Sequence, residues 1–232
     1  MDQNLVLSYI IHAYQIYIML RKYLFFGFTF PFLIACNKDE KLNTVVIDYY
    51  PLGVGNYWIY QNYLIDTSGL VNELSFMDSV TVVGDTSLSG NIYKHVKSYE
   101  ITDGVVKRSS STFLRDSLDY IVDQDGQIIL SSSDNSYTLY QFAPLSPSGD
   151  AFVEITYRMK LDEETVSVPA GEFEAISLQG SLRYNGNAPG SEYPRHFGTY
   201  YAEGVGKVFE RYFYANQADT QERRLLRYQL ID

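Results

Sequence analysis

The residues of this chain that could support hydrolytic chemistry are two glutamates in its C-terminal half. Glu172 and Glu174 are two positions apart, so in a strand their side chains share one face. Two carboxylates on one face could serve as the acid and the base of a glycosidase. The same arrangement is common on a solvated strand face, and we favour that interpretation. A glycosidase-like enzyme is therefore the disfavoured alternative, and the sequence favours a non-enzymatic protein.

Other catalytic and metal-binding patterns are missing from the sequence. The histidines, His12, His95 and His196, have no partners at zinc-ligand spacing. No Gly-x-Ser-x-Gly elbow, Walker loop or dinucleotide-binding glycine pattern occurs. The segment Asp123-Gln124-Asp125-Gly126 has the start of a calcium loop but not its further ligands, so we interpret it as a hairpin turn. We expect neither a metal site nor a cofactor.

The single cysteine, Cys36, follows a segment typical of exported proteins. Arg21 and Lys22 form a short positive region, and the residues from Tyr23 to Ala35 carry no charge. That apolar stretch has the length of a signal peptide and is shorter than the roughly 20 residues needed to span a bilayer. The residues Leu33-Ile34-Ala35-Cys36 resemble the lipobox of bacterial lipoproteins. The resemblance implies cleavage before Cys36 and attachment of acyl chains to it.

These features predict four segments. Residues 19–35 are the expected lipoprotein signal peptide, and residues 36–48 are the lipidated cysteine and its tether. Residues 1–18 are interpreted as an N-terminal extension from a mis-called start, and residues 49–232 as one β-rich domain. The alternative is an uncleaved anchor beginning at Met1. Arg21 and Lys22 would then lie within the bilayer, at a cost of about 2.5–3.5 kcal/mol each.

The residues directly after the cysteine predict the final location. Lys38, Asp39 and Glu40 resemble the surface-export signal of Bacteroidota lipoproteins, which implies display on the outer face of the outer membrane. The alternative is an ordinary solvated tether. The formal charge of −10, with no basic cluster, argues against nucleic acid as a partner. The expected partner is the membrane, reached through the lipid.

Aromatic residues in the first expected strand are the candidate ligand-binding residues. Tyr57, Trp58, Tyr60 and Tyr63 lie close together, and exposed rings on a strand can stack on sugars or anchor a protein. By alternation Trp58 and Tyr60 share one face, and Tyr57 and Tyr63 share the other. One of the two faces must be core, so packing is the competing interpretation for most of these rings.

The elements that must position these residues are β-strands, because the apolar pattern from about Tyr49 onward has a period of two. We predict an all-β single domain of about 11–13 mostly antiparallel strands, in a curved sheet, half-barrel or sandwich. Ala151–Leu161 and Thr165–Val168 are predicted as separate strands. The residues from Ala215 to Arg224 are interpreted as a loop between two strands. Asp103-Gly104 is predicted to form a hairpin turn.

Three motifs resemble a family of secreted and lipidated β-proteins of unknown function, sometimes grouped as TapB-like. They are Tyr50-Pro51-Leu52-Gly53-Val54-Gly55-Asn56-Tyr57-Trp58-Ile59-Tyr60, Val168-Pro169-Ala170-Gly171-Glu172-Phe173 and Tyr200-Tyr201-Ala202-Glu203-Gly204-Val205-Gly206-Lys207-Val208. In the third motif Glu203 stands where the family pattern has proline. The resemblance implies a curved antiparallel sheet and no catalytic residues. Physically, Pro169 and Gly171 predict a kink or bulge between two strands.

Three hypotheses for function follow from these observations. The first is a surface lipoprotein whose β-domain binds a glycan or protein partner through exposed aromatic rings. The second is an envelope protein that carries a lipid or another hydrophobe in a cavity of a half-barrel. The third is the glycosidase-like enzyme, which needs paired carboxylates facing a cleft.

Overall fold

The computed structural model describes residues 48–134, 139–142, 153–184, 197–214 and 217–231. The secondary-structure elements within these residues are all β-strands. This agrees with the alternating pattern and the abundance of Tyr, Val, Ile and Thr, which favour strands. The strands are β1 (Tyr57–Ile65), β2 (Val71–Leu88), β3 (Asn91–Thr102), β4 (Val105–Ser117), β5 (Tyr120–Asp123), β6 (Ile128–Ser131), β7 (Tyr140–Phe142), β8 (Val153–Val168), β9 (Gly171–Tyr184), β10 (Phe197–Ala202), β11 (Gly206–Phe213) and β12 (Thr220–Gln229).

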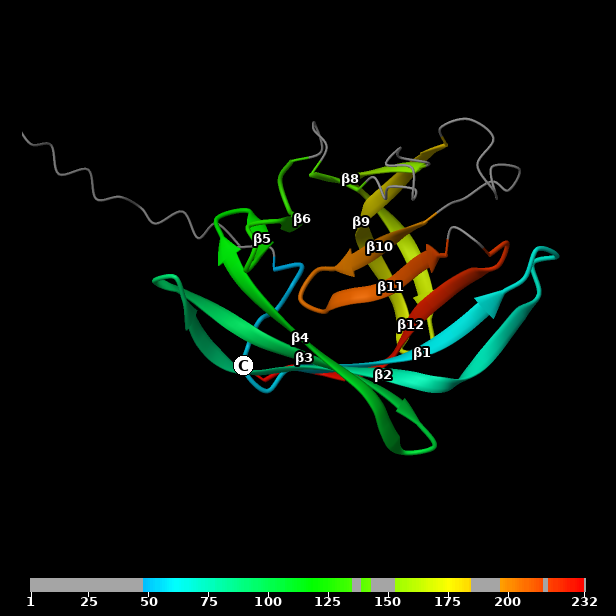
Figure 1. The fold of residues 1–232 in the computed structure, drawn as a ribbon, viewed down its shortest axis with the longest axis horizontal. Helices are drawn as coiled ribbons and strands as arrows, with labels where there is room; N and C mark the ends of the chain where they lie inside the picture. The colour runs from blue at the N-terminus through cyan, green and yellow to red at the C-terminus, as the bar shows by residue number, and fades with distance from the viewer. Residues whose placement is uncertain (1–47, 135–138, 143–152, 185–196, 215–216, 232) are drawn as a thin grey trace, which may run out of the picture. The chain divides into compact units, whose positions relative to one another are not determined.

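The strands form one antiparallel sheet made of two meanders (Figure 1). Its order is β6-β5-β4-β3-β2-β1-β12-β11-β10-β9-β8-β7. Within each meander, β1 to β6 and β7 to β12, every strand pairs with its neighbours in sequence, and the pairing of β1 with β12 joins the two meanders. The predicted fold class is confirmed, because the described residues form a single all-β sheet of 12 antiparallel strands.

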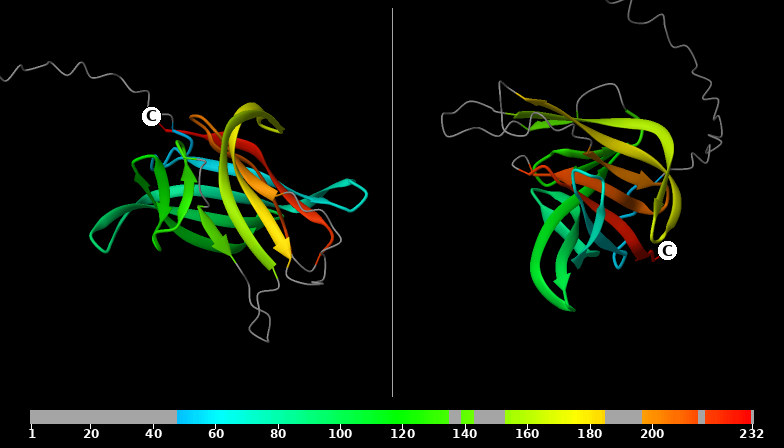
Figure 2. Two further views of the ribbon diagram at one scale, coloured as in Figure 1. Left: turned by 90° about the horizontal axis from the view of Figure 1, so that it is seen from above. Right: turned by 90° about the vertical axis from the view of Figure 1, so that its right-hand side faces the viewer.

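The sheet must curl because its two edge strands are neighbours in the chain. Twelve strands spaced about 4.8 Å apart would place the edges roughly 53 Å apart in a flat sheet. However, β6 ends at Ser131 and β7 begins at Tyr140. At about 3.4 Å per residue, an extended chain over that stretch reaches roughly 31 Å. The sheet therefore bends until it is nearly closed into a barrel (Figure 2).

Bulges in the long strands provide part of this bend. The register of β2 with β3 shifts between Val82 and Gly84, and that of β8 with β9 shifts between Lys160 and Glu164. A bulge bends its strand and increases the local twist. In the curved sheet β8 also lies against β11 and β12, which are not its ladder partners.

The hydrophobic core lies on the concave face of the sheet. Met159 in β8 is buried while its neighbours Arg158 and Lys160 are exposed, as the predicted alternation requires. Residues of both meanders contribute to this core. They include Trp58, Tyr60, Val82, Val96, Leu114, Met159, Ile176, Leu178, Tyr201, Val208 and Leu225.

Four local predictions are wrong. The residues from 153 to 168 form one strand rather than two, because β8 continues through its bulge. The motif around Pro169 forms a hairpin turn between β8 and β9 rather than a kink or bulge. Phe197–Ala202 is a strand, β10, that the alternation did not reveal. The expected loop ends early, because β12 begins at Thr220.

The Asp-Gly turns are confirmed. Asp103 and Gly104 have φ values of 52° and 74° between β3 and β4, a left-handed pair suited to a tight hairpin. In the turn from β5 to β6, Asp123 Oδ1 accepts hydrogen bonds from the backbone amides of Asp125 at 2.9 Å and Gln127 at 2.8 Å. The carboxylate that could have belonged to a calcium loop therefore holds this turn.

We expect Gly180→Ala to lower the free energy of unfolding by about 2–3 kcal/mol, as overpacking a core does. A Cβ atom at Gly180 would lie 1.6 Å from Cε2 of Phe197. The Phe197 ring would then have to leave Tyr157 and Phe213, whose ring centroids lie 5.7 and 5.1 Å away. Urea denaturation measures the loss. Gly84→Ala is the control, because its Cβ meets nothing within 4 Å, and equal losses in both variants would contradict this packing.

Candidate functional site

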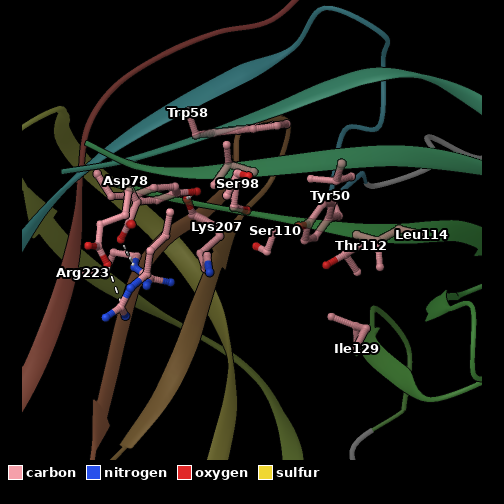
Figure 3. A pocket seen from close by; sticks show the side chains of 16 residues that line it. Tyr50, Trp58, Asp78, Ser98, Ser110, Thr112, Leu114, Ile129, Lys207 and Arg223 are labelled. Atoms are coloured by element: carbon pink, nitrogen blue, oxygen red, sulfur yellow. Dashed lines mark hydrogen bonds and ion pairs between the residues drawn. The ribbon is translucent and has the colours of Figure 1, made fainter. Parts of the chain in front are cut away.

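A groove of about 450 Å³ opens on the concave face of the sheet (Figure 3). Strands β1 to β4 form one wall, and Lys207 of β11 and Arg223 of β12 approach from the other meander. Its volume lies within the roughly 300–1,000 Å³ typical of small-molecule sites. The nearly closed curl of the sheet therefore creates a site of ligand size.

The groove changes from charged to apolar along its length. Residues paired across β2, β3 and β4 form successive rows on the face that lines it. Asp78, Glu100 and Arg108 make a charged row, and Val80, Ser98 and Ser110 make a mixed row. Val96 and Thr112 follow, and then Leu114 and Ile129 at the far end from Asp78 and Arg223 (Figure 3). The walls would suit a molecule with one polar end and one apolar end.

A network of side chains fixes the charged end. Arg223 lies between two carboxylates, with Nε 2.7 Å from Asp78 Oδ2 and Nη1 donating to Glu210 Oε2 at 2.9 Å. Lys207 Nζ donates to the same Glu210 oxygen at 3.0 Å. Asn62 Nδ2 donates to Asp78 Oδ2 at 3.0 Å. The network links β1, β2, β11 and β12, so it joins the two meanders at their central seam.

The charges around Glu210 keep it ionised. Burial raises the pKa of this carboxyl, but the positive charges of Lys207 and Arg223 and their hydrogen bonds outweigh burial and lower the pKa from its ordinary 4.5. Arg223 experiences the converse effect. Burial lowers the pKa of Arg223, but the negative charges of Glu210 and Asp78 raise it by more. The pKa of Arg223 is therefore higher than its ordinary value. At neutral pH both partners are therefore charged.

We expect the stabilisation by Glu210 to vanish in acid. Because its folded pKa lies below the unfolded value near 4.5, the stabilising effect is complete above about pH 5 and is lost as the pH falls through the folded pKa. Unfolding free energies of wild type and Glu210→Gln, measured from pH 7 to pH 3, should therefore converge at the acidic end. A constant difference over this range would show that the charge of Glu210 does not stabilise the fold.

Aromatic side chains form the groove wall near the chain's first strand. Trp58 Nε1 donates to the carbonyl of Val205 at 2.7 Å, and the hydroxyl of Tyr60 donates to the carbonyl of Lys207 at 2.9 Å. The Tyr50 ring packs against Trp58 and Tyr201, with centroids 6.4 and 5.9 Å away. Thus the first and third sequence motifs pack together to hold one wall of the groove.

Tyr50 also lines the groove (Figure 3). Burial, and then the charge of Glu210, raise the pKa of Tyr50 to about 12. Burial also raises the pKa of Tyr60 well above its ordinary value. Both phenols are therefore protonated at neutral pH, and the Tyr50 hydroxyl can donate a hydrogen bond.

The structure divides the four candidate aromatic residues as the alternation predicts. Trp58 and Tyr60 line the groove but are each only 2% exposed. Tyr57 and Tyr63 lie on the opposite face and are partly buried. Arg224 covers the ring of Tyr63, with Cζ 4.4 Å from the centroid. Only Trp58 and Tyr60 therefore belong to the groove wall, and the four rings do not form one exposed patch.

The other candidates lie away from the groove or outside the described residues. Glu172 and Glu174 are exposed on β9 and accept hydrogen bonds from Ser167 and Thr165. His95 forms a hydrogen bond with Ser111 on the face opposite the groove. Cys36, the residues Lys38, Asp39 and Glu40 that the sequence suggests as an export signal, and the histidines His12 and His196 fall outside the described residues.

In the part of the chain that the structure describes, no three His, Cys, Asp or Glu side chains are grouped to hold a metal ion. Within the same residues, no helix has the length and apolar character needed to cross a membrane.

The charged residues of the groove were missed by the sequence analysis, although a signal exists. Asp78 shares strand parity with Val80 and Val82, and Glu100 shares it with Val96. Charged side chains that continue an apolar strand face need partners there. That rule could have marked them as members of a buried network or a site.

No protein-family model matches the chain, and no curated protein matches it. Two solved structures are similar to it. A candidate lipoprotein of Parabacteroides distasonis has a TM-score of 0.47 and 10% identity, over 79% of this chain and 99% of its own. A candidate exported protein of Bacteroides fragilis with a YmcC-like fold has a TM-score of 0.44 and 13% identity, over 79% of this chain and 100% of its own.

Proposed function

We propose that the chain is an exported, lipid-anchored protein of the outer membrane whose sheet binds a small amphipathic molecule in the groove. The observation that carries this proposal is the change in polarity along the groove. Charged Asp78 and Arg223 line one end, and apolar Leu114 and Ile129 line the other. Apolar walls favour a hydrocarbon part, and a few placed polar groups orient the ligand.

The location rests on the N-terminal sequence. The uncharged segment ending at Cys36 supports lipidation, and Lys38, Asp39 and Glu40 support display at the cell surface. Two or three acyl chains, at about 0.8 kcal/mol per buried CH₂, would hold the protein on the membrane essentially permanently. A groove tethered close to a bilayer has ready access to amphipathic molecules.

A groove ligand fits the geometry better than an exposed aromatic platform for a glycan or protein. Trp58 and Tyr60 offer almost no accessible ring surface, Tyr57 and Tyr63 are partly buried, and Arg224 lies over the Tyr63 ring. Stacking on a sugar requires an open ring face. We therefore favour the second hypothesis over the first.

The groove residues also argue against hydrolysis. Asp78 and Glu100 are cross-strand partners facing the groove, as paired catalytic carboxylates would be. Asp78, however, is 9% exposed and already binds Arg223 and Asn62. A carboxylate held by a guanidinium and an amide is poorly placed to take up or release a proton.

The proposal is tested by filling the groove. The chain has one tryptophan, Trp58, so its fluorescence reports on this site alone. We expect octyl glucoside, added below its micelle concentration to the full chain kept soluble in amphipol, to change the emission saturably. Ser110→Phe, which points a ring into the groove, should abolish the change. Ser111→Phe on the opposite face of β4 should retain it. No saturable change in wild type, or equal binding by both variants, would refute the proposal.

A further inference from the structure

The polar end of the groove has uncommitted groups of both signs. Lys207 Nζ has three N–H donors and uses one of them, on Glu210. Among the described residues, the ion-pair partner of Glu100 is Arg108, at 3.8 Å, which is too long for a hydrogen bond. The Lys207 side chain is 19% exposed and that of Glu100 is 28% exposed, so both are reachable from the groove.

The formal charges at this end cancel. Arg223 and Lys207 neutralise Asp78 and Glu210 within the network, and Arg108 balances Glu100. A ligand end with a net charge would therefore leave one charge unbalanced at this end, whichever of the unused groups it met. It would also lie beside a like charge that is only partly solvated, which costs free energy.

Hydroxyl groups complete the lining. Ser98 and Ser110 lie next to the charged row, Thr112 lies one row further along, and Tyr50 lines the same groove (Figure 3). Each hydroxyl can donate and accept, and none adds charge. Donors and acceptors are thus interspersed around a polar end that is electrically balanced.

Resting on the function proposed above, we infer that the ligand's polar end carries no net charge and is hydroxylated or zwitterionic. It lies against Lys207, Glu100 and the serines, while its hydrocarbon part lies along Val96, Leu114 and Ile129. Lys207 supplies donors to a ligand oxygen, and Glu100 accepts from a ligand hydroxyl or faces its cationic group. Fatty acids and cationic amphiphiles are disfavoured by the unbalanced charge they would bring.

Four ligands with the same eight-carbon tail test this inference on the full chain in amphipol, read by Trp58 fluorescence. They are octyl glucoside, octylphosphocholine, octanoate and octyltrimethylammonium. We expect at least one of the first two to bind about tenfold more tightly than either ion, because charge mismatch opposes binding. Tighter or equal binding of octanoate or the ammonium would overturn the inference and leave the groove function standing. Binding of none of the four would overturn the groove function itself.

Charge-changing variants give an independent arm. Glu100→Gln leaves the groove with one excess positive charge. The affinity for octanoate should therefore rise about tenfold relative to the affinity for octyl glucoside. Lys207→Met leaves one excess negative charge, so the affinity for octyltrimethylammonium should rise by a similar factor. Circular dichroism establishes that each variant is folded before titration. Unchanged headgroup preferences in both folded variants would contradict the assigned contacts.

Discussion

Replacing Arg223 with methionine is expected to lower the free energy of unfolding by about 3 kcal/mol, near the lower end for a broken buried ion pair. The substitution leaves Asp78 and Glu210 facing each other's negative charge with one fewer cation between them. The Arg223 side chain is 27% exposed, so solvent screens part of the effect. Urea denaturation followed by the emission of Trp58 measures the loss.

The matched control is Arg227→Met on the same strand. Arg227 is exposed and makes no ion pair among the described residues. Its replacement should change the unfolding free energy by no more than about 0.5 kcal/mol, as for ordinary surface positions. If both substitutions lower the free energy of unfolding by the same amount, the network around Arg223 does not hold the two meanders together.

Replacing Cys36 with alanine is expected to abolish acylation of the chain completely. Without the sulfur no diacylglyceryl group can be attached, so incorporation of an alkyne-labelled fatty acid should fall to background. The membrane-bound fraction should fall as well, because each acyl chain contributes about 0.8 kcal/mol per buried CH₂ to attachment. Labelling and fractionation of the two strains measure both effects. Unchanged labelling, or full membrane retention, would contradict the role assigned to this cysteine.

The export residues give a second comparison with a different outcome. Alanine at Lys38, Asp39 and Glu40 should preserve fatty-acid labelling while removing the protein from the cell surface. Protease added to intact cells should then degrade the wild type and spare the variant. Equal degradation of both proteins would show that this tripeptide acts only as a tether.

Much of the fold follows from local pattern. The period of two and the Asp-Gly turns predict antiparallel hairpins in series, because each hairpin is specified by residues adjacent in the chain. The strand β10 could not be predicted from this pattern, because apolar and polar residues do not alternate regularly in Phe197-Gly198-Thr199-Tyr200-Tyr201-Ala202. Both of its faces pack, so both carry apolar residues.

The central seam could not be predicted in the same way. The pairing of β1 with β12 joins strands from opposite ends of the described chain, and no local pattern specifies it. The network of Asp78, Arg223 and Glu210 exists only once that seam forms. The sequence does mark these residues indirectly, since Glu210 shares parity with buried Val208 and Arg223 with buried Leu225.

The candidate aromatic residues show the same limit. Alternation correctly separates Trp58 and Tyr60 from Tyr57 and Tyr63. It cannot say which face curls inward, because curvature depends on bulges and on the short link between the edge strands. The groove is therefore a property of the assembled sheet rather than of the first strand.

Native mass spectrometry of the full chain, extracted from its own membranes without added amphiphile, tests the central claim most directly. The wild type should carry one bound small amphiphile per chain, and Ser110→Phe should carry none. An adduct that is absent from wild type, or equally abundant in both proteins, would contradict the claim that the groove binds an amphipathic molecule.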